Sequence, residues 1–168
     1  DVPADQIRAG LEATRPVPGR LNLVHAPGGW TVIDDTYNAN PASMGAALDT
    51  LKLFRGEGRR TVAALGSMLE LGPDAAALHR QLGAAAAASG IERLCAYGDF
   101  ADDILAGAHS GGLAGAQCFS GSHQEIATDL AGWLRPGDCL LAKGSRGMKM
   151  ETAVSLLEAM LTAGEDGE

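Results

Sequence analysis

The 168-residue sequence has no run of about 18 apolar residues, the length that spans a membrane. Residues 1–5 carry neither a basic stretch nor a hydrophobic one, so they do not resemble a secretion signal. The three cysteines, Cys95, Cys118 and Cys139, form no CxxC pair and lie far apart, which argues against a zinc or redox site. Each lies in a short apolar run. We therefore expect buried, reduced thiols in a soluble cytoplasmic protein.

Basic residues are also scarce, with 13 Lys and Arg against 21 Asp and Glu and a formal net charge of −8. This charge has the wrong sign for a protein that binds nucleic acid or an anionic membrane. The length fits one domain with a small extra piece, and 46% hydrophobic residues suffice for a core without disulfides or metals. A small ligand that is neutral or zwitterionic, or a phosphate held by a few local cations, fits this composition.

Several catalytic motifs are missing from the sequence. It has no GxxxxGK[ST] phosphate loop, no GxGxxG after a strand, and no GxSxG or HExxH. The four histidines are scattered, and we expect them to be packing or surface residues, with His79 the least certain of them. The chain by itself is therefore expected to be neither an NTPase nor a dinucleotide-binding domain, and no catalytic or metal-binding residue is assigned.

The periodicity of apolar residues predicts an α/β fold. Two strands, 21–25 and 30–34, flank the Pro/Gly loop 26–29 and should form an antiparallel hairpin. The other strands are expected at 61–65, 93–97, 116–119 and 138–142, and the helices at 3–13, 41–54, 73–88, 100–108, 123–134 and 148–161. This alternation indicates a three-layer, Rossmann-like fold with a mostly parallel sheet and one antiparallel edge strand.

The prolines and glycine of residues 16–19 indicate a linker after the first helix. We therefore expect residues 1–17 to be the tail of an upstream domain with its linker, and residues 18–168 to be the domain itself. The chain would then be a piece of a longer protein, cut near a domain boundary.

Loops that follow strands carry the candidate site, because ligands of such sheets bind at the carboxyl ends of strands. The loop 34–41 holds two carboxylates, a phenol and two carboxamides. Asn40 before Pro41 is explained by helix capping alone, but capping does not explain the whole cluster. An aspartate at the end of a strand commonly accepts a hydrogen bond from a ribose hydroxyl.

A second polar loop, 143–149, places Lys143, Ser145 and Arg146 at the start of the last helix. Two cations, a hydroxyl and a helix N-terminus are expected to converge there on a carboxylate or phosphate. The alternative is structural, with Ser145 capping the helix and Arg146 solvated. A third loop, 66–72, contains Gly66 and Glu70, and by itself it is weak evidence for a binding site.

Three stretches together carry a resemblance to a known family: 34–44 (DDTYNANPASM), 65–72 (LGSMLELG) and 143–151 (KGSRGMKME). In this order, and over nearly the whole length, the chain resembles the C-terminal domain of the Mur ligases. The resemblance implies the third domain of an ATP-dependent amide ligase of peptidoglycan synthesis. ATP would convert a substrate carboxylate to an acyl phosphate that the incoming amine attacks. The NANP string resembles the members that add D-alanyl-D-alanine to a UDP-N-acetylmuramoyl-tripeptide.

The resemblance also implies roles for individual residues. Arg20 matches a linker arginine that reaches ATP after domain closure, and Asp35 matches an acid that contacts the ribose. Tyr37 and Asn38 fall on the nucleotide side. The residues expected on the side of the incoming dipeptide are Asn40, Ser43, Lys143, Ser145 and Arg146. Ser67 stands where the family usually has an acid.

The partners implied are the N-terminal and central domains of the same chain, with ATP and Mg²⁺ held mainly by the central domain. The isolated chain is expected to be inactive. The alternatives are the C-terminal domain of a sister Mur ligase or of folylpolyglutamate synthetase, or a non-catalytic α/β binding domain.

Overall fold

The computed structural model describes residues 2–14, 17–26 and 28–165. Arg15 and Pro16 of the expected linker and Pro27 of the hairpin loop lie outside these residues. The strands are β1 (Asn22–His25), β2 (Thr31–Asp35), β3 (Thr61–Gly66), β4 (Arg93–Tyr97), β5 (Cys118–Ser120) and β6 (Cys139–Lys143). The helices are α1 (Ala4–Glu12), α2 (Pro41–Gly56), α3 (Ala75–Ala88), α4 (Ala101–Ser110), α5 (His123–Trp133) and α6 (Glu151–Glu165).

The predicted α/β class and the order of elements are confirmed, but most element boundaries differ from the predicted ones by one to four residues. The last helix begins at Glu151, because residues Arg146–Met148 form a separate 3₁₀ turn and Lys149 adopts a left-handed backbone. Strand β6 runs one residue further than predicted, to Lys143. Residues Gly115–Gln117 form a 3₁₀ turn, so strand β5 starts later than expected.

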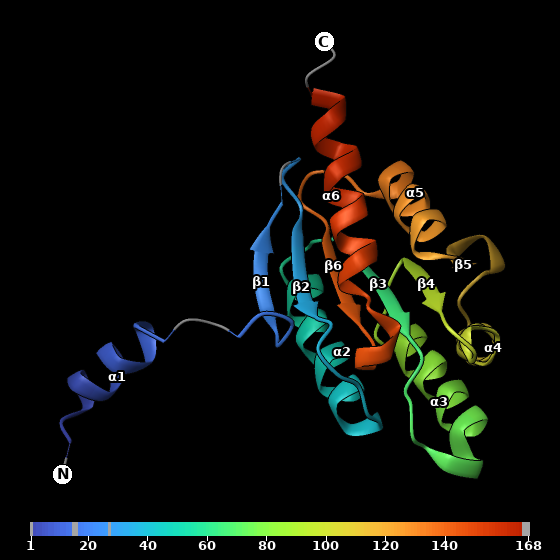
Figure 1. Cartoon of the computed structure of the whole chain (residues 1–168), viewed down its shortest axis with the longest axis horizontal. Helices are drawn as coiled ribbons and strands as arrows, with labels where there is room; N and C mark the ends of the chain where they lie inside the picture. The colour runs from blue at the N-terminus through green and yellow to red at the C-terminus, as the bar shows by residue number, and fades with distance from the viewer. Residues whose placement is uncertain (1, 15–16, 27, 166–168) are drawn as a thin grey trace.

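The strands form one sheet in the order β1-β2-β6-β3-β4-β5. Strands β1 and β2 pair antiparallel, as predicted, and the other neighbours pair parallel. The last strand, β6, therefore lies between β2 and β3 (Figure 1). In this register Lys143 is level with Asp35 on one side and with Leu65 on the other.

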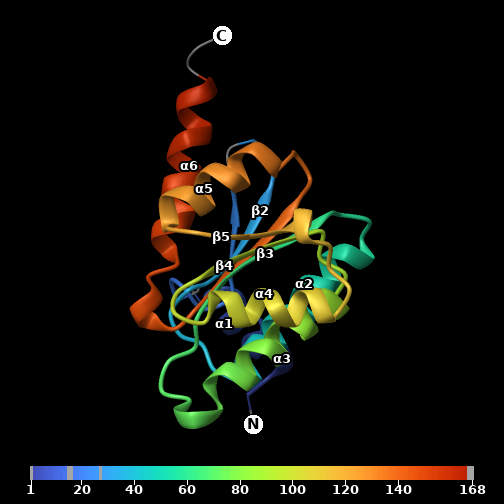
Figure 2. The same ribbon diagram turned by 90° about the vertical axis from the view of Figure 1, so that its right-hand side faces the viewer.

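Helices cover both faces of the sheet, so the fold has three layers (Figure 2). Helices α2, α3 and α4 pack on one face, where Leu51, Leu82 and Ile104 join the core. Helices α5 and α6 pack on the other face through Leu130 and Leu157. Because α2 follows β2 on one face and α6 follows β6 on the other, the chain leaves adjacent strands in opposite directions. Such a point is where open α/β sheets bind ligands.

Helix α1 stands apart from the sheet in Figure 1 and has no buried residue. Its apolar side chains Ile7 and Leu11 are 52% and 70% exposed. The assignment of residues 1–17 to an upstream domain stays a prediction.

The cysteines lie in strands, as expected, and all three are free. Cys95 and Cys139 are buried, whereas Cys118 is only partly buried. Burial raises the pKa of the Cys95 thiol and raises that of Cys139 to about 12, which leaves both protonated at neutral pH. Within the described residues, no helix has the length and apolar character needed to cross a bilayer.

Candidate functional site

Three polar loops meet at the carboxyl edge of the sheet because β2, β6 and β3 are adjacent. They are residues 36–40 after β2, 144–149 after β6 and 67–71 after β3. These are the loops that the sequence singled out, and strand order alone brings them together.

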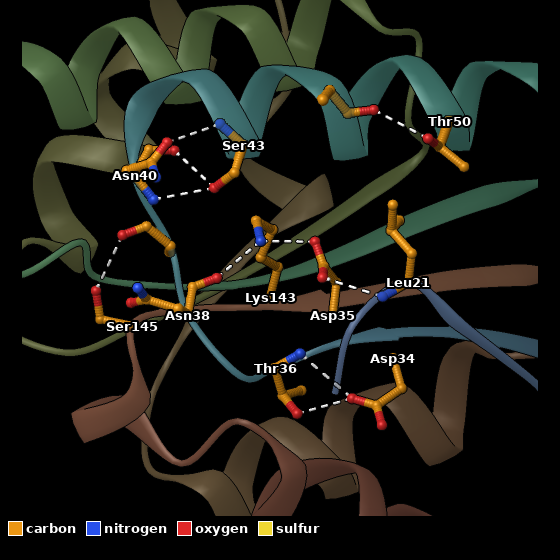
Figure 3. Close-up of polar contacts among 12 residues, drawn as sticks. Leu21, Asp34, Asp35, Thr36, Asn38, Asn40, Ser43, Thr50, Lys143 and Ser145 are labelled. Carbon is orange, nitrogen blue, oxygen red and sulfur yellow. Dashed lines mark hydrogen bonds and ion pairs between the residues drawn. The ribbon is translucent and has the colours of Figure 1, made fainter. Parts of the chain in front are cut away.

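Lys143 and Asp35 form an ion pair at the centre of this edge (Figure 3). The Lys143 Nζ atom lies 2.6 Å from Asp35 Oδ2 and 2.8 Å from the carbonyl oxygen of Asn38. The Lys143 side chain is 2% exposed and that of Asp35 is 13% exposed. Asp35 Oδ1 also accepts a hydrogen bond from the Leu21 amide at 3.1 Å. The pair therefore ties β6 to the loop after β2 and to the segment before β1.

Asp34 fixes the same region from the other face of its strand. Its Oδ1 accepts a 2.7 Å hydrogen bond from Thr36 Oγ1, and its Oδ2 accepts one from the Gly19 amide at 3.1 Å. The Tyr37 amide donates to the Gly19 carbonyl at 2.9 Å. Gly19 has a φ of +73°, and an added Cβ would lie 3.0 Å from the Tyr37 nitrogen, so glycine is favoured there. These contacts hold Arg20 beside Tyr37, with its guanidinium 4.1 Å from the ring centroid.

A first polar cavity of about 320 Å³ lies next to this ion pair. Its lining includes Arg20, Asp35, Tyr37, Asn38, Ser43 and Lys143. It thus collects all four residues that were predicted to face a nucleotide. Lys143 and Ser43, predicted on the side of the dipeptide, also line this first cavity.

A second, larger cavity of about 590 Å³ lies on the other side of the loop after β2. Its lining includes Asn38, Asn40, Leu69, Glu70, Ser145 and Arg146. Tyr37, Asn38 and Asn40 line both cavities, so one short loop separates two polar spaces.

The expected convergence of Lys143 and Arg146 on one anion is wrong. Lys143 is buried and paired with Asp35, whereas the Arg146 side chain is 64% exposed and pairs with Glu151 at 2.8 Å. The two cations line different cavities, because the chain turns through Gly144 and Ser145 between them. No long helix starts at this turn either, since α6 begins only at Glu151.

Asn40 caps α2, as predicted from its place before Pro41. Its side chain accepts a hydrogen bond from the Ser43 amide at 2.9 Å, and Ser43 Oγ accepts one from the Asn40 amide at 3.1 Å. This reciprocal capping box fixes where the helix starts (Figure 3). Ligand binding by Asn40 and Ser43 stays a prediction.

The loop after β3 is anchored at three successive residues. Ser67 Oγ accepts a hydrogen bond from the Phe100 amide at 3.1 Å and donates one to the Tyr97 carbonyl at 3.2 Å. The Met68 amide donates to His79 Nε2 at 2.8 Å. The Leu69 amide donates to Ser145 Oγ at 2.9 Å.

His79 is the buried partner in this anchor. It is fully buried, and its ring stacks on Phe100 with centroids 4.4 Å apart. Because Nε2 accepts the Met68 amide proton, the ring proton belongs on Nδ1, which lies 2.7 Å from the Ala75 carbonyl oxygen. The expectation that His79 is a packing residue is correct, but its role in holding a site loop was missed. The signal was available, since Ala75, His79 and Leu82 share one face of the helix.

Within the part of the chain that the structure describes, no group of three or more His, Cys, Asp or Glu side chains is placed to hold a metal ion.

A family model described as "Mur ligase, glutamate ligase domain" matches residues 19–146 of the sequence. The chain belongs to the Mur ligase family. The match covers all three loops of the site except the end of the last one, and it confirms the resemblance drawn from the sequence.

Individual relatives agree with this assignment. The chain is 34% identical over 158 residues to UDP-N-acetylmuramoyl-tripeptide–D-alanyl-D-alanine ligase of Bacillus subtilis, which covers 91% of this chain and 34% of that protein. It is similar to the structure of MurF from Acinetobacter baumannii, with a TM-score of 0.80, 31% identity and coverage of 94% and 34%. MurF ligase from Thermotoga maritima in complex with ADP gives a TM-score of 0.77, 26% identity and coverage of 90% and 33%.

The chain thus spans about a third of the length of the relatives it matches. The sheet with its antiparallel edge corresponds to the C-terminal domain of MurF ligases.

Proposed function

We propose that the chain is the C-terminal domain of an ATP-dependent ligase that adds D-alanyl-D-alanine to a UDP-N-acetylmuramoyl-tripeptide. The observation that carries the proposal is the pair of polar cavities on either side of residues 37–40. A reaction between an activated carboxylate and an amine needs two ligands held next to each other, and this loop contacts both spaces. The similarity to D-alanyl-D-alanine ligases supports the choice of substrates.

The first cavity is proposed to face ATP. Arg20 and Tyr37 offer a stacked cation and ring, and Asp35 keeps free acceptor capacity beside its bonds to Lys143 and Leu21 for a ribose hydroxyl. Asn38 lies at the edge of the same space. The similar MurF ligase that was solved with ADP supports an adenine nucleotide as a ligand of the whole enzyme.

The second cavity is proposed to hold the dipeptide, with Asn40, Ser145 and Arg146 on its walls. The exposed guanidinium of Arg146 suits a carboxylate. Ser145 is 3% exposed and bonded to the Leu69 amide, so it shapes the wall more than it reaches into the cavity.

The chemistry proposed for the whole enzyme has two steps. The γ-phosphoryl group of ATP is transferred to the carboxylate of the tripeptide, which gives an acyl phosphate and ADP. The dipeptide amine then attacks the carbonyl carbon, phosphate leaves with the bonding electrons, and the nitrogen loses its proton. The role of this domain is to close over the nucleotide and present the amine, because an acyl phosphate exposed to water hydrolyses.

The remaining partners are proposed to be the N-terminal and central domains of the same protein, in the cytoplasm. Since the described residues form no metal-ligand set, Mg²⁺ is proposed to be held by the central domain. Residues 1–17 are proposed to belong to that domain and its linker.

The assay that tests this function uses the full-length protein with ATP, a UDP-N-acetylmuramoyl-tripeptide and D-alanyl-D-alanine. We expect formation of the pentapeptide product together with ADP and phosphate. Product from a single amino acid instead of the dipeptide would identify a sister ligase. Nucleotide and dipeptide binding without any product would identify a binding domain.

The chain alone should fold but show no ATP turnover. The sheet is covered on both faces and buries its own core, so a cooperative thermal transition is expected. No phosphate loop is present in the sequence, so ADP release should stay at the buffer background. Circular dichroism and a coupled ADP assay check the two parts. Steady ATP hydrolysis by the purified chain would contradict the proposal that this domain needs the other domains of the enzyme to use ATP.

Replacing Arg20 by Gln in the full-length enzyme should raise the Michaelis constant for ATP by on the order of tenfold to a hundredfold, the effect of losing one charged hydrogen bond. Folding stability should change little, because Arg20 is exposed and its contact is the Tyr37 ring. Steady-state kinetics with varied ATP give the result. Arg135→Gln is the matched control, since that exposed arginine lies at the opposite edge of the sheet, in the turn before β6. Equal effects of both variants would remove Arg20 from the nucleotide site.

A further inference from the structure

Glu70 is an acidic residue on the wall of the second cavity that has a strained backbone. Its φ is +62°, in the left-handed region that residues with a Cβ rarely adopt. Its side chain is exposed and lines the cavity. Among the residues that the structure describes, it makes no ion pair and its carboxylate accepts no hydrogen bond. Neither capping nor an internal salt bridge therefore explains the acid at this position.

The loop holds Glu70 in place through the residues before it. Ser67, Met68 and Leu69 are each bonded to a different part of the fold, through Phe100, His79 and Ser145 respectively. Strained conformations persist where the surroundings determine them this strongly, and they concentrate at functional sites. The backbone of Glu70 is therefore held at the wall of the cavity, where its exposed carboxylate is available to a ligand.

The second cavity carries the opposite charge on another wall. The Arg146 side chain is 64% exposed, and the only ion pair it makes among the described residues is the one with Glu151. A guanidinium has five N–H donors, so most of its capacity remains for a ligand. A carboxylate and a guanidinium that line one cavity are complementary to a zwitterion. An extended dipeptide separates its ammonium and carboxylate by about 7 Å.

We propose that Glu70 binds the ammonium group of the incoming amino substrate while Arg146 binds its carboxylate. This inference rests on the proposed function, since it gives each end of the dipeptide a partner in the cavity assigned to it. Glu70 is then a specificity-determining residue, because it selects a substrate with a free amino group.

The test is Glu70→Gln in the full-length ligase, which keeps the size of the side chain and removes its charge. The Michaelis constant for D-alanyl-D-alanine should rise by on the order of tenfold to a hundredfold. The Michaelis constant for ATP and kcat should stay within about twofold. Glu57→Gln is the control, because Glu57 is an exposed glutamate at the end of α2 that lines neither cavity. An unchanged constant for the dipeptide, or a loss in kcat alone, overturns the proposal.

An analogue without the amino group separates recognition from general damage. N-propionyl-D-alanine keeps the carboxylate of the dipeptide but has no ammonium, so it should inhibit Glu70→Gln and wild type equally. Arg146→Gln should weaken the same inhibitor. If Glu70→Gln also weakens it by tenfold or more, Glu70 shapes the cavity instead of binding the ammonium, and the proposal fails. Failure of the proposed function has another signature, because then the wild-type enzyme itself forms no product from D-alanyl-D-alanine.

Discussion

Replacing Lys143 by Met should lower the free energy of unfolding of the chain by about 3–5 kcal/mol, the usual effect of breaking a buried ion pair. The lysine side chain is 2% exposed, and its Nζ is bonded to both Asp35 and the Asn38 carbonyl. Without it, the Asp35 carboxylate is left in a mostly buried place with only the Leu21 amide as partner. Chemical denaturation of the isolated chain, followed by circular dichroism, measures the change.

The chain contains a matched control for this prediction. Lys52 and Asp49 also form a Lys–Asp pair, at 2.8 Å, but their side chains are 48% and 73% exposed. Lys52→Met should therefore change the free energy of unfolding by at most about 1 kcal/mol. Adding Asp35→Asn to Lys143→Met should restore part of the lost stability, because the second change removes the uncompensated charge. If Lys143→Met behaves like Lys52→Met, the ion pair is not the structural centre of the site.

The buried lysine shows where inference from sequence reaches its limit. The sequence indicated a cation at the end of a strand, and that is where Lys143 lies. Its burial depends on strand order, because β6 is inserted between β2 and β3 and places Lys143 level with Asp35 and Leu65. Local sequence patterns indicate where a strand lies, but they do not indicate which strands pair with it. The fold class was therefore predictable, whereas the separation of Lys143 from Arg146 was not.

Unusual backbone conformation is a second feature that could not be predicted from the sequence. The left-handed φ of Glu70 has no signal in the sequence, since glutamate is not a residue that favours this region. Asn40 is the opposite case, because its cap depends only on the adjacent Pro41 and on Ser43 three residues later. The cap at Asn40 was therefore predicted from adjacent residues, whereas the backbone of Glu70 was not.

Helices α3 and α4 pack with their backbones close together, and this contact depends on two glycines. An added Cβ on Gly83 would lie 1.8 Å from the Ile104 carbonyl oxygen, and one on Gly107 would lie 1.9 Å from the Arg80 carbonyl oxygen. Both obstacles are backbone atoms, which cannot rotate away as a side chain could. Gly83→Ala should therefore destabilise the chain by about 3 kcal/mol, at the upper end of the range for overpacking, although alanine favours a helix by about 1 kcal/mol over glycine.

Gly45→Ala is the control that separates overpacking from helix propensity. Gly45 lies inside α2, and a Cβ there would meet nothing within 4 Å. This variant should gain up to about 1 kcal/mol in the free energy of unfolding. Gly83→Ala combined with Gly107→Ala should lose less than the sum of the single losses, because once the first methyl group separates the helices the second meets less resistance. Chemical denaturation of wild type, Gly45→Ala, Gly83→Ala, Gly107→Ala and the double variant measures these changes in the free energy of unfolding. A Gly83→Ala variant as stable as wild type would show that the two helices can separate freely. Because α3 also carries His79, which holds the loop before Glu70, such freedom would mean that the wall of the second cavity is not fixed by this contact.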